Sequence, residues 1–177
     1  LLQFEDGVYV NVVEAAGPVE GFNDEGLART SWDTVWFDCD NDGWEDLFVA
    51  NGSVPGAEEF VPTEINSPNA LYRNLADGTF ELVSEGTALD NDKLGRGAKF
   101  TDLDADGALE LFVENNGTAF VQVGDDIAFV QGIQSHLYSA RPTPGNHWAE
   151  FRLRGTRSNV EALGTRLDAF ADGRHQR

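Results

Sequence analysis

Cysteine, methionine and basic residues are scarce in this sequence, and each scarcity narrows what the protein can be. The single cysteine, Cys39, excludes an internal disulfide. Only 12 Lys and Arg stand against 31 Asp and Glu, a net charge of −19. Such a chain is unsuited to nucleic acids and to anionic membrane surfaces, because phosphate contacts need Lys and Arg. There is no methionine and the first residue is Leu1, so we expect a mature or excised segment.

Long apolar runs and helical periodicity are also missing. No apolar stretch approaches the roughly 20 residues of a transmembrane helix, so no membrane span is expected. The best short helical candidate is residues 159–163. Short alternating or aromatic-rich runs bounded by Gly, Asn, Asp or Pro dominate instead, which predicts an all-β protein. The predicted strands are residues 8–13, 34–37, 46–50, 70–73, 79–83, 98–101, 110–114, 119–123 and 148–153.

The chain repeats itself. Two acidic loops, each followed by an apolar run, start 64 residues apart at positions 38 and 102. A repeat of strands with a fixed loop predicts propeller blades or another repeated β architecture. We expect a long loop over residues 52–68, a third, degenerate unit from Asn116, and a boundary at residues 141–145. The predicted domains are residues 1–140, with the β repeats, and residues 141–177, the start of a different β module.

Both acidic loops, residues 38–46 and 102–110, have the pattern expected of a calcium site. Aspartates fill positions 1, 3 and 5, glycine permits a sharp turn at position 6, and a carboxylate stands at position 9. Calcium takes about six to eight oxygen ligands in a flexible shell, whereas magnesium keeps waters and a strict octahedron. The predicted ligands are Asp38, Asp40, Asp42, Asp46 and the Trp44 carbonyl in the first loop, and Asp102, Asp104, Asp106, Glu110 and the Ala108 carbonyl in the second.

Two other interpretations compete with this one. An EF-hand also opens D-x-D-x-D-G, but it needs a bidentate Glu at position 12 and flanking helices. Position 12 is Val49 or Val113, each within an apolar β-run. A solvated acidic turn without metal is the plainer alternative, and two copies in matching strand contexts argue against it. The favoured role for calcium is to stabilise a hairpin, ahead of direct contact with a ligand.

The loops and their flanks, residues 37–49 and 100–113, resemble the FG-GAP/VCBS repeat. Residues 68–74 and 77–80 resemble the sequence segments that connect such repeats. The resemblance implies propeller blades, and 177 residues are fewer than a full propeller needs. We therefore expect an incomplete propeller, a fragment, or β units completed by neighbouring chains. Glu110 departs from the aspartate usual at position 9, so its longer side chain must be accommodated.

Residues 146–159 together with Gly164 resemble the opening of an ASPIC/UnbV module. FG-GAP/VCBS repeats followed by such a module are similar to the cartilage acidic protein family and its bacterial relatives. The resemblance implies a secreted or surface-exposed calcium-binding protein that makes adhesive or matrix contacts.

The remaining candidates are weaker. His136, His147 and His175 are scattered without metal-ligand spacing, and no nucleophile elbow or Walker loop occurs. We therefore predict no enzymatic activity. Asn51 and Asn116 each begin a glycosylation sequon just after a repeated strand.

Three hypotheses follow. The first is a non-catalytic extracellular module with two Ca²⁺ sites that binds a protein or glycan of the matrix or cell surface. The second is a self-associating subunit of an extracellular filament or surface assembly. The third is a fragment of a larger propeller enzyme whose catalytic residues lie elsewhere.

Overall fold

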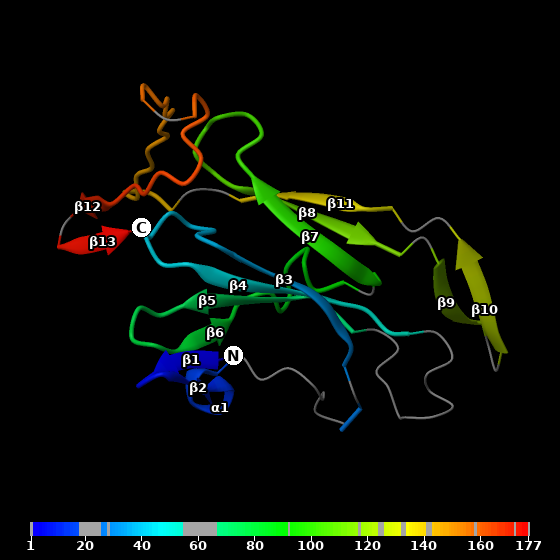
Figure 1. The fold of residues 1–177 in the computed structure, drawn as a ribbon. Helices are drawn as coiled ribbons and strands as arrows, with labels where there is room; N and C mark the ends of the chain where they lie inside the picture. Colours follow the sequence, from blue (N-terminus) through cyan, green and yellow to red (C-terminus); the bar gives the residue numbers. More distant parts are fainter. Residues whose placement is uncertain are drawn as a thin grey trace.

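The computed structural model describes residues 2–17, 26–27, 29–54, 67–91, 93–116, 118–123, 126–131, 134–140, 143–157, 159–171 and 173–176. This part of the chain is nearly all β, in antiparallel sheets, as predicted (Figure 1). The helix is α1, Val13–Ala16, and none of the described helical residues forms a span long and apolar enough to cross a membrane. The strands are β1 Leu2–Glu5, β2 Val8–Asn11, β3 Ser31–Phe37, β4 Asp46–Asn51, β5 Ala70–Asn74, β6 Phe80–Leu82, β7 Gly95–Thr101, β8 Glu110–Asn115, β9 Thr118–Val123, β10 Asp126–Gln131, β11 His136–Ser139, β12 Ala169–Ala171 and β13 Arg174–Gln176.

The first repeat forms a four-stranded sheet in the order β3-β4-β5-β6. All six residues of β4 are buried, because this strand is paired on both edges and covered on both faces. Leu47 and Val49 pack with β5 and β6, whereas Phe48 and Ala50 point into a second cluster shared with the other repeat. This alternation is the period of two expected of a strand with two covered faces.

The second repeat forms a three-stranded sheet in the order β11-β8-β7. The hairpin β9–β10 is inserted between β8 and β11 and pairs only with itself among the described strands. His136 of β11 pairs with Val113 of β8, so this strand completes the second sheet. The expected third unit from Asn116 is therefore wrong, because its last strand belongs to the second repeat. The described sheets are not closed into a barrel.

The two sheets pack through β3 and β7, at matching positions of the repeat. Each strand has a bulge at its start, and the bulged residues Trp32 and Arg96 are 64 positions apart. The Arg96 guanidinium lies 4.3 Å from the centroid of the Trp32 ring. Asp33 accepts a hydrogen bond from the Ala98 amide at 3.0 Å, which joins the two strands directly. The structural repeat thus supplies the contacts between the sheets.

Two local predictions are wrong. Residues 148–153 form no strand, although their composition favours one. They follow the short segment Thr143–Trp148, which lies on the acidic loops. Residues 159–163 form turns, with Asn159 accepting a hydrogen bond from the Leu163 amide at 2.7 Å. A contact with a distant loop accompanies the missing strand, whereas side-chain and backbone bonds within the turn replace the helix.

Candidate metal sites

Each acidic loop connects the first two strands of its sheet, β3 to β4 and β7 to β8. Both loops therefore start and end on strands of the shared core. The position-12 residues Val49 and Val113 lie within β4 and β8 and are 4% and 0% exposed. Neither residue can supply the ligand that an EF-hand requires, and no helix flanks either loop in the described residues. The strand-flanked interpretation is confirmed.

The first loop is held by its own carboxylates. Asp38 accepts hydrogen bonds from the amides of Asp42 at 3.0 Å and Gly43 at 2.8 Å. Asp40 accepts from the Asp42 amide at 3.1 Å, and Asp42 accepts from the Trp44 amide at 2.8 Å. Gly43 has a φ of 89°, in the left-handed region that glycine tolerates. These bonds turn the chain sharply and draw the odd-numbered side chains inward.

The second loop repeats the same bonds. Asp102 accepts from the amides of Asp106 at 3.2 Å and Gly107 at 3.0 Å. Asp104 accepts from the Asp106 amide at 3.3 Å, and Asp106 accepts from the Ala108 amide at 2.8 Å. Gly107 has a φ of 87°. Two stretches with different sequences between their acidic positions thus adopt the same turn.

Carboxylates converge in both loops, although the two sets differ. Oxygens of Asp38, Asp40 and Asp42 lie within 4.8 Å of one another. In the second loop the converging oxygens belong to Asp102, Asp104 and Glu110, also within 4.8 Å. A set of carboxylate oxygens at this spacing is the donor chemistry of a hard divalent cation such as calcium.

The residue at position 9 explains why different carboxylates converge in the two loops. Asp46 is 1% exposed, and its two oxygens accept the amides of Cys39 at 3.0 Å and Asn74 at 2.9 Å. It is not among the converging carboxylates of its loop. Glu110 also accepts the position-2 amide, from Leu103 at 2.8 Å, and its longer side chain still reaches the cluster. The glutamate therefore fits where sequence reasoning saw only a departure from the repeat pattern.

Crowding and burial raise the pKa values of acidic side chains in the first loop. Burial raises the pKa of Asp38 above its ordinary value, and the neighbouring Asp42 and Asp40 charges add to the shift. Burial, followed by the charges of Asp42 and Asp46, raises the pKa of Asp40. Burial likewise raises the pKa of the half-buried Cys39 thiol, so this side chain is held in the unreactive protonated form. A cation among these carboxylates would relieve their mutual repulsion.

The other sequence predictions for this region have mixed outcomes. Asn51 is 0% exposed, and its amide donates to the Pro68 carbonyl at 2.9 Å. The folded chain therefore hides this sequon, which argues against a glycan on Asn51. Asn116 is part-buried and stays a prediction, because Gly117 of its sequon lies outside the described residues. The Trp44 and Ala108 carbonyls as ligands also stay predictions.

Sequence reasoning missed a set of contacts between the loops and the rest of the chain. The Asn41 amide of the first loop donates to the Gly107 carbonyl of the second at 2.7 Å. Asn146 donates to the Asp40 carbonyl at 2.9 Å. The indole of Trp148 lies against Gly107, since a Cβ built there would overlap its Nε1. No periodicity signals these contacts, which join positions 66, 106 and 41 residues apart in the sequence.

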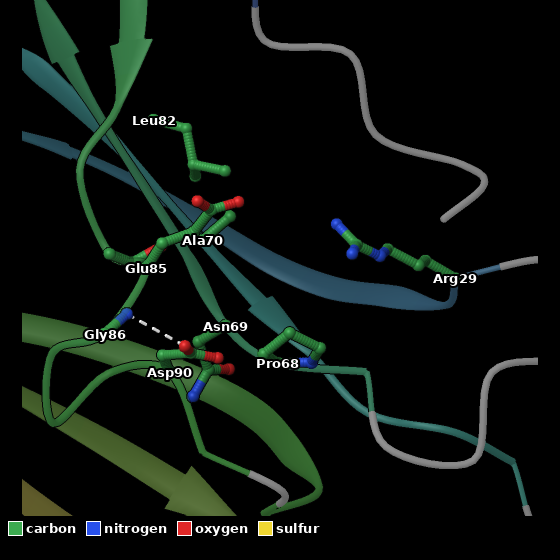
Figure 2. A pocket seen from close by; sticks show the side chains of 9 residues that line it. Arg29, Pro68, Asn69, Ala70, Leu82, Glu85, Gly86 and Asp90 are labelled. Atoms are coloured by element: carbon green, nitrogen blue, oxygen red, sulfur yellow. Dashed lines mark hydrogen bonds between the residues drawn. The ribbon is translucent and has the colours of Figure 1, made fainter. Parts of the chain in front are cut away.

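A pocket of about 400 Å³ lies at the far end of the first sheet (Figure 2). Ala70, which lines it, pairs with Val49 near the end of β4 opposite the acidic loop. Arg29 stands on one side of the pocket, with Glu85 and Asp90 on the other. The pocket is thus separate from the converging carboxylates.

Fold and loops together define an all-β repeat module in which each repeat carries one acidic loop between its first two strands. Residues 38–113 match the family model for an FG-GAP-like repeat. The match runs from the first position of the first loop to β8, and so includes both loops while covering less than half of the chain. FG-GAP repeats are propeller-type and generally non-catalytic. No curated protein matches the chain. The FG-GAP resemblance is confirmed for this stretch, and the ASPIC/UnbV segment stays a prediction.

Proposed function

We propose that this protein is a calcium-binding, non-catalytic module with one Ca²⁺ site in each acidic loop. The observation that carries the proposal is the recurrence of one hydrogen-bonded turn in both loops, each with three converging carboxylates. In the second cluster the converging carboxylates include Glu110, which is only 7% exposed, so part of this charge lies away from solvent. Calcium there would offset the charge repulsion and stabilise the link between the first two strands of each sheet.

Thermal unfolding and calorimetry of the full chain test the proposal. Calcium at ten times its dissociation constant should stabilise the folded state by about 1.4 kcal/mol per site. With two sites this raises the melting temperature by about 6–11 °C relative to EGTA. The double variants D38N/D40N and D102N/D104N should each remove one of two calcium equivalents. The charge-matched control E5Q/D6N, in the exposed β1–β2 turn, should keep both. An unchanged melting temperature in EGTA, with no calcium heat, would show the metal assignment to be wrong.

We further infer that the module works outside the cell, on a protein or glycan of the matrix or cell surface. A net charge of −19 is relieved by bound divalent cations. Extracellular modules bind calcium with dissociation constants of about 10⁻⁴–10⁻³ M, which suits a stabilising role in calcium-rich surroundings. Binding of the purified chain to immobilised matrix or to cells, with calcium against EGTA, measures this directly. Equal binding in both conditions would contradict a calcium-stabilised binding surface.

Self-association into a filament or surface assembly is a second candidate, supported by the N-terminal hairpin. All residues of β1 and β2 are exposed, including Phe4 at 63% and Tyr9 at 72%. A two-stranded ribbon with apolar side chains in solvent is marginal alone and gains stability by packing against another sheet. Sedimentation velocity with calcium and with EGTA distinguishes the candidates, because a calcium-dependent polymer favours assembly and a persistent monomer favours a binding module.

A further inference from the structure

A short hydrogen bond joins the two acidic loops. Asn41, at position 4 of the first loop, donates its side-chain amide to the Gly107 carbonyl at 2.7 Å. Asn41 has a φ of 57°, a left-handed conformation that asparagine tolerates better than most residues. Gly107 is the residue whose left-handed φ turns the second loop. The contact therefore joins a left-handed residue of the first loop to the turning glycine of the second.

The segment Thr143–Trp148 lies across both loops. The Asp40 carbonyl accepts the Thr143 amide at 3.3 Å and the Asn146 side chain at 2.9 Å. Two residues further on, the Trp148 indole covers Gly107 of the second loop. Figure 1 shows the chain after β11 running back toward the connection between β3 and β4. One short segment thus contacts both turns.

The three hydrogen bonds among these contacts are accepted by the carbonyls of Asp40 and Gly107, so none of them occupies a carboxylate oxygen. Fixing the carbonyls of Asp40 and Gly107 fixes the backbone turns from which the acidic side chains converge. Ordering one turn therefore orders part of the other, and the second metal ion meets a loop whose conformational entropy is already reduced. Binding sites that share an ordering cost in this way are positively coupled.

We propose that the two acidic loops and the segment Thr143–Trp148 form one coupled metal-binding unit, with Asn41 and Asn146 as positioning residues. The inference rests on the proposed calcium function. Calcium at either loop favours calcium at the other and holds the segment against the loops. Because coupling is reciprocal, the affinity gained by each loop from its partner is the same factor, expected to be about fivefold or more.

Calcium calorimetry on the full chain measures the coupling. D102N/D104N reports the first loop alone, and D38N/D40N reports the second. The wild type should bind calcium about fivefold more tightly than the two single-loop proteins predict for independent sites. Asn41→Gly keeps the left-handed backbone and removes only the amide, so its isotherm should fall to that of independent sites. The matched control Ala105→Gly changes the equivalent residue, with φ of 60° and no role in the contact, and should keep the coupling.

Hydrogen exchange supplies a second readout, which starts from the wild type. Calcium should slow exchange of the Thr143 amide in the wild type by about the same fivefold factor. The effect should be reduced in D38N/D40N, which keeps only the second site, and reduced in Asn146→Ala. The coupling would be wrong if two equivalents of calcium bound with independent affinities, or if the Thr143 exchange rate did not change with calcium. Either result would still be compatible with two calcium sites. Absence of any calcium heat in the wild type would refute the proposed function itself.

Discussion

Gly107→Ala tests whether Trp148 packs on the second loop as the structure shows. Gly107 has a φ of 87°, and an alanine there is strained whatever surrounds it. The left-handed conformation costs a residue with a Cβ about 1–2 kcal/mol. The added methyl would also overlap Nε1 and Cδ1 of the Trp148 ring, so the indole must leave its position.

The loss of folding free energy when Trp148 leaves its position follows from how much of the side chain is buried. The side chain is 47% exposed, so about half of its surface is covered by the fold. An aromatic ring of this kind has roughly 200 Å² to bury, and losing half of it costs about 2.5 kcal/mol. Together with the backbone strain, Gly107→Ala should lower the free energy of unfolding by about 3.5–4.5 kcal/mol. This is an upper figure, because the unfolded chain already hides part of its apolar surface.

A matched glycine separates the backbone strain from the displacement of Trp148. Gly78 has a φ of 91° and nothing within 4 Å of a Cβ built on it. Gly78→Ala should therefore lose only the backbone strain of about 1–2 kcal/mol. Urea unfolding in calcium, followed by circular dichroism, compares the two variants on the same scale. In a Trp148→Ala background, Gly107→Ala should cost no more than Gly78→Ala does. Equal losses in the wild-type background, or an excess at Gly107 that survives removal of Trp148, would refute this packing.

The remaining predictions concern the core, the contact between the sheets and the C-terminal turn. Phe48→Ala, at a fully buried position in the cluster shared by both sheets, should lower the unfolding free energy by about 3–5 kcal/mol, and a loss below about 1 kcal/mol in urea would contradict that core. Arg96→Lys should lose about 2 kcal/mol by the same assay, because lysine cannot both stack on Trp32 and bond several carbonyls; a neutral result would argue against the contact. Hydrogen bonds from Arg166 and then His175 hold the pKa of Asp168 below 3.8, so its stabilising effect is present above that pH and is lost as the pH falls through the lowered pKa. Arg166→Ala should raise this pKa in an NMR titration, and an unmoved value would exclude the ion pair.

Local pattern predicted much of the fold. Alternating or continuous short apolar runs placed eight of the nine predicted strands. A strand with one covered face alternates with a period of two, and a strand covered on both faces is apolar throughout. The D-x-D-x-D-G spacing placed both acidic loops and their glycine turns, since carboxylates bonding to amides a few residues ahead need only the chain around them. The valines at position 12 exclude an EF-hand from the sequence alone, because neither can supply the bidentate carboxylate.

Contacts between distant segments decided the rest. Residues 148–153 have a strand-like composition but form no strand, and Trp148 packs on Gly107 instead. Asn51 begins a glycosylation sequon, yet in the folded chain it is buried and donates a hydrogen bond to the Pro68 carbonyl. These outcomes depend on which surfaces come into contact after folding. Local composition does not predict those contacts.

The acidic loops show both sides of this division. The sequence by itself determined that each loop turns at a glycine and gathers its carboxylates, because those interactions close within nine residues. Only the tertiary structure decided that Asp46 bonds to Asn74 and stays out of the converging carboxylates, and that Asn41 connects the two loops. The physical reason is that these contacts join each loop to chain segments outside it. Asp46 meets Asn74 where β5 runs beside β4, and Asn41 meets Gly107, 66 residues away in the sequence, where the two repeats pack together.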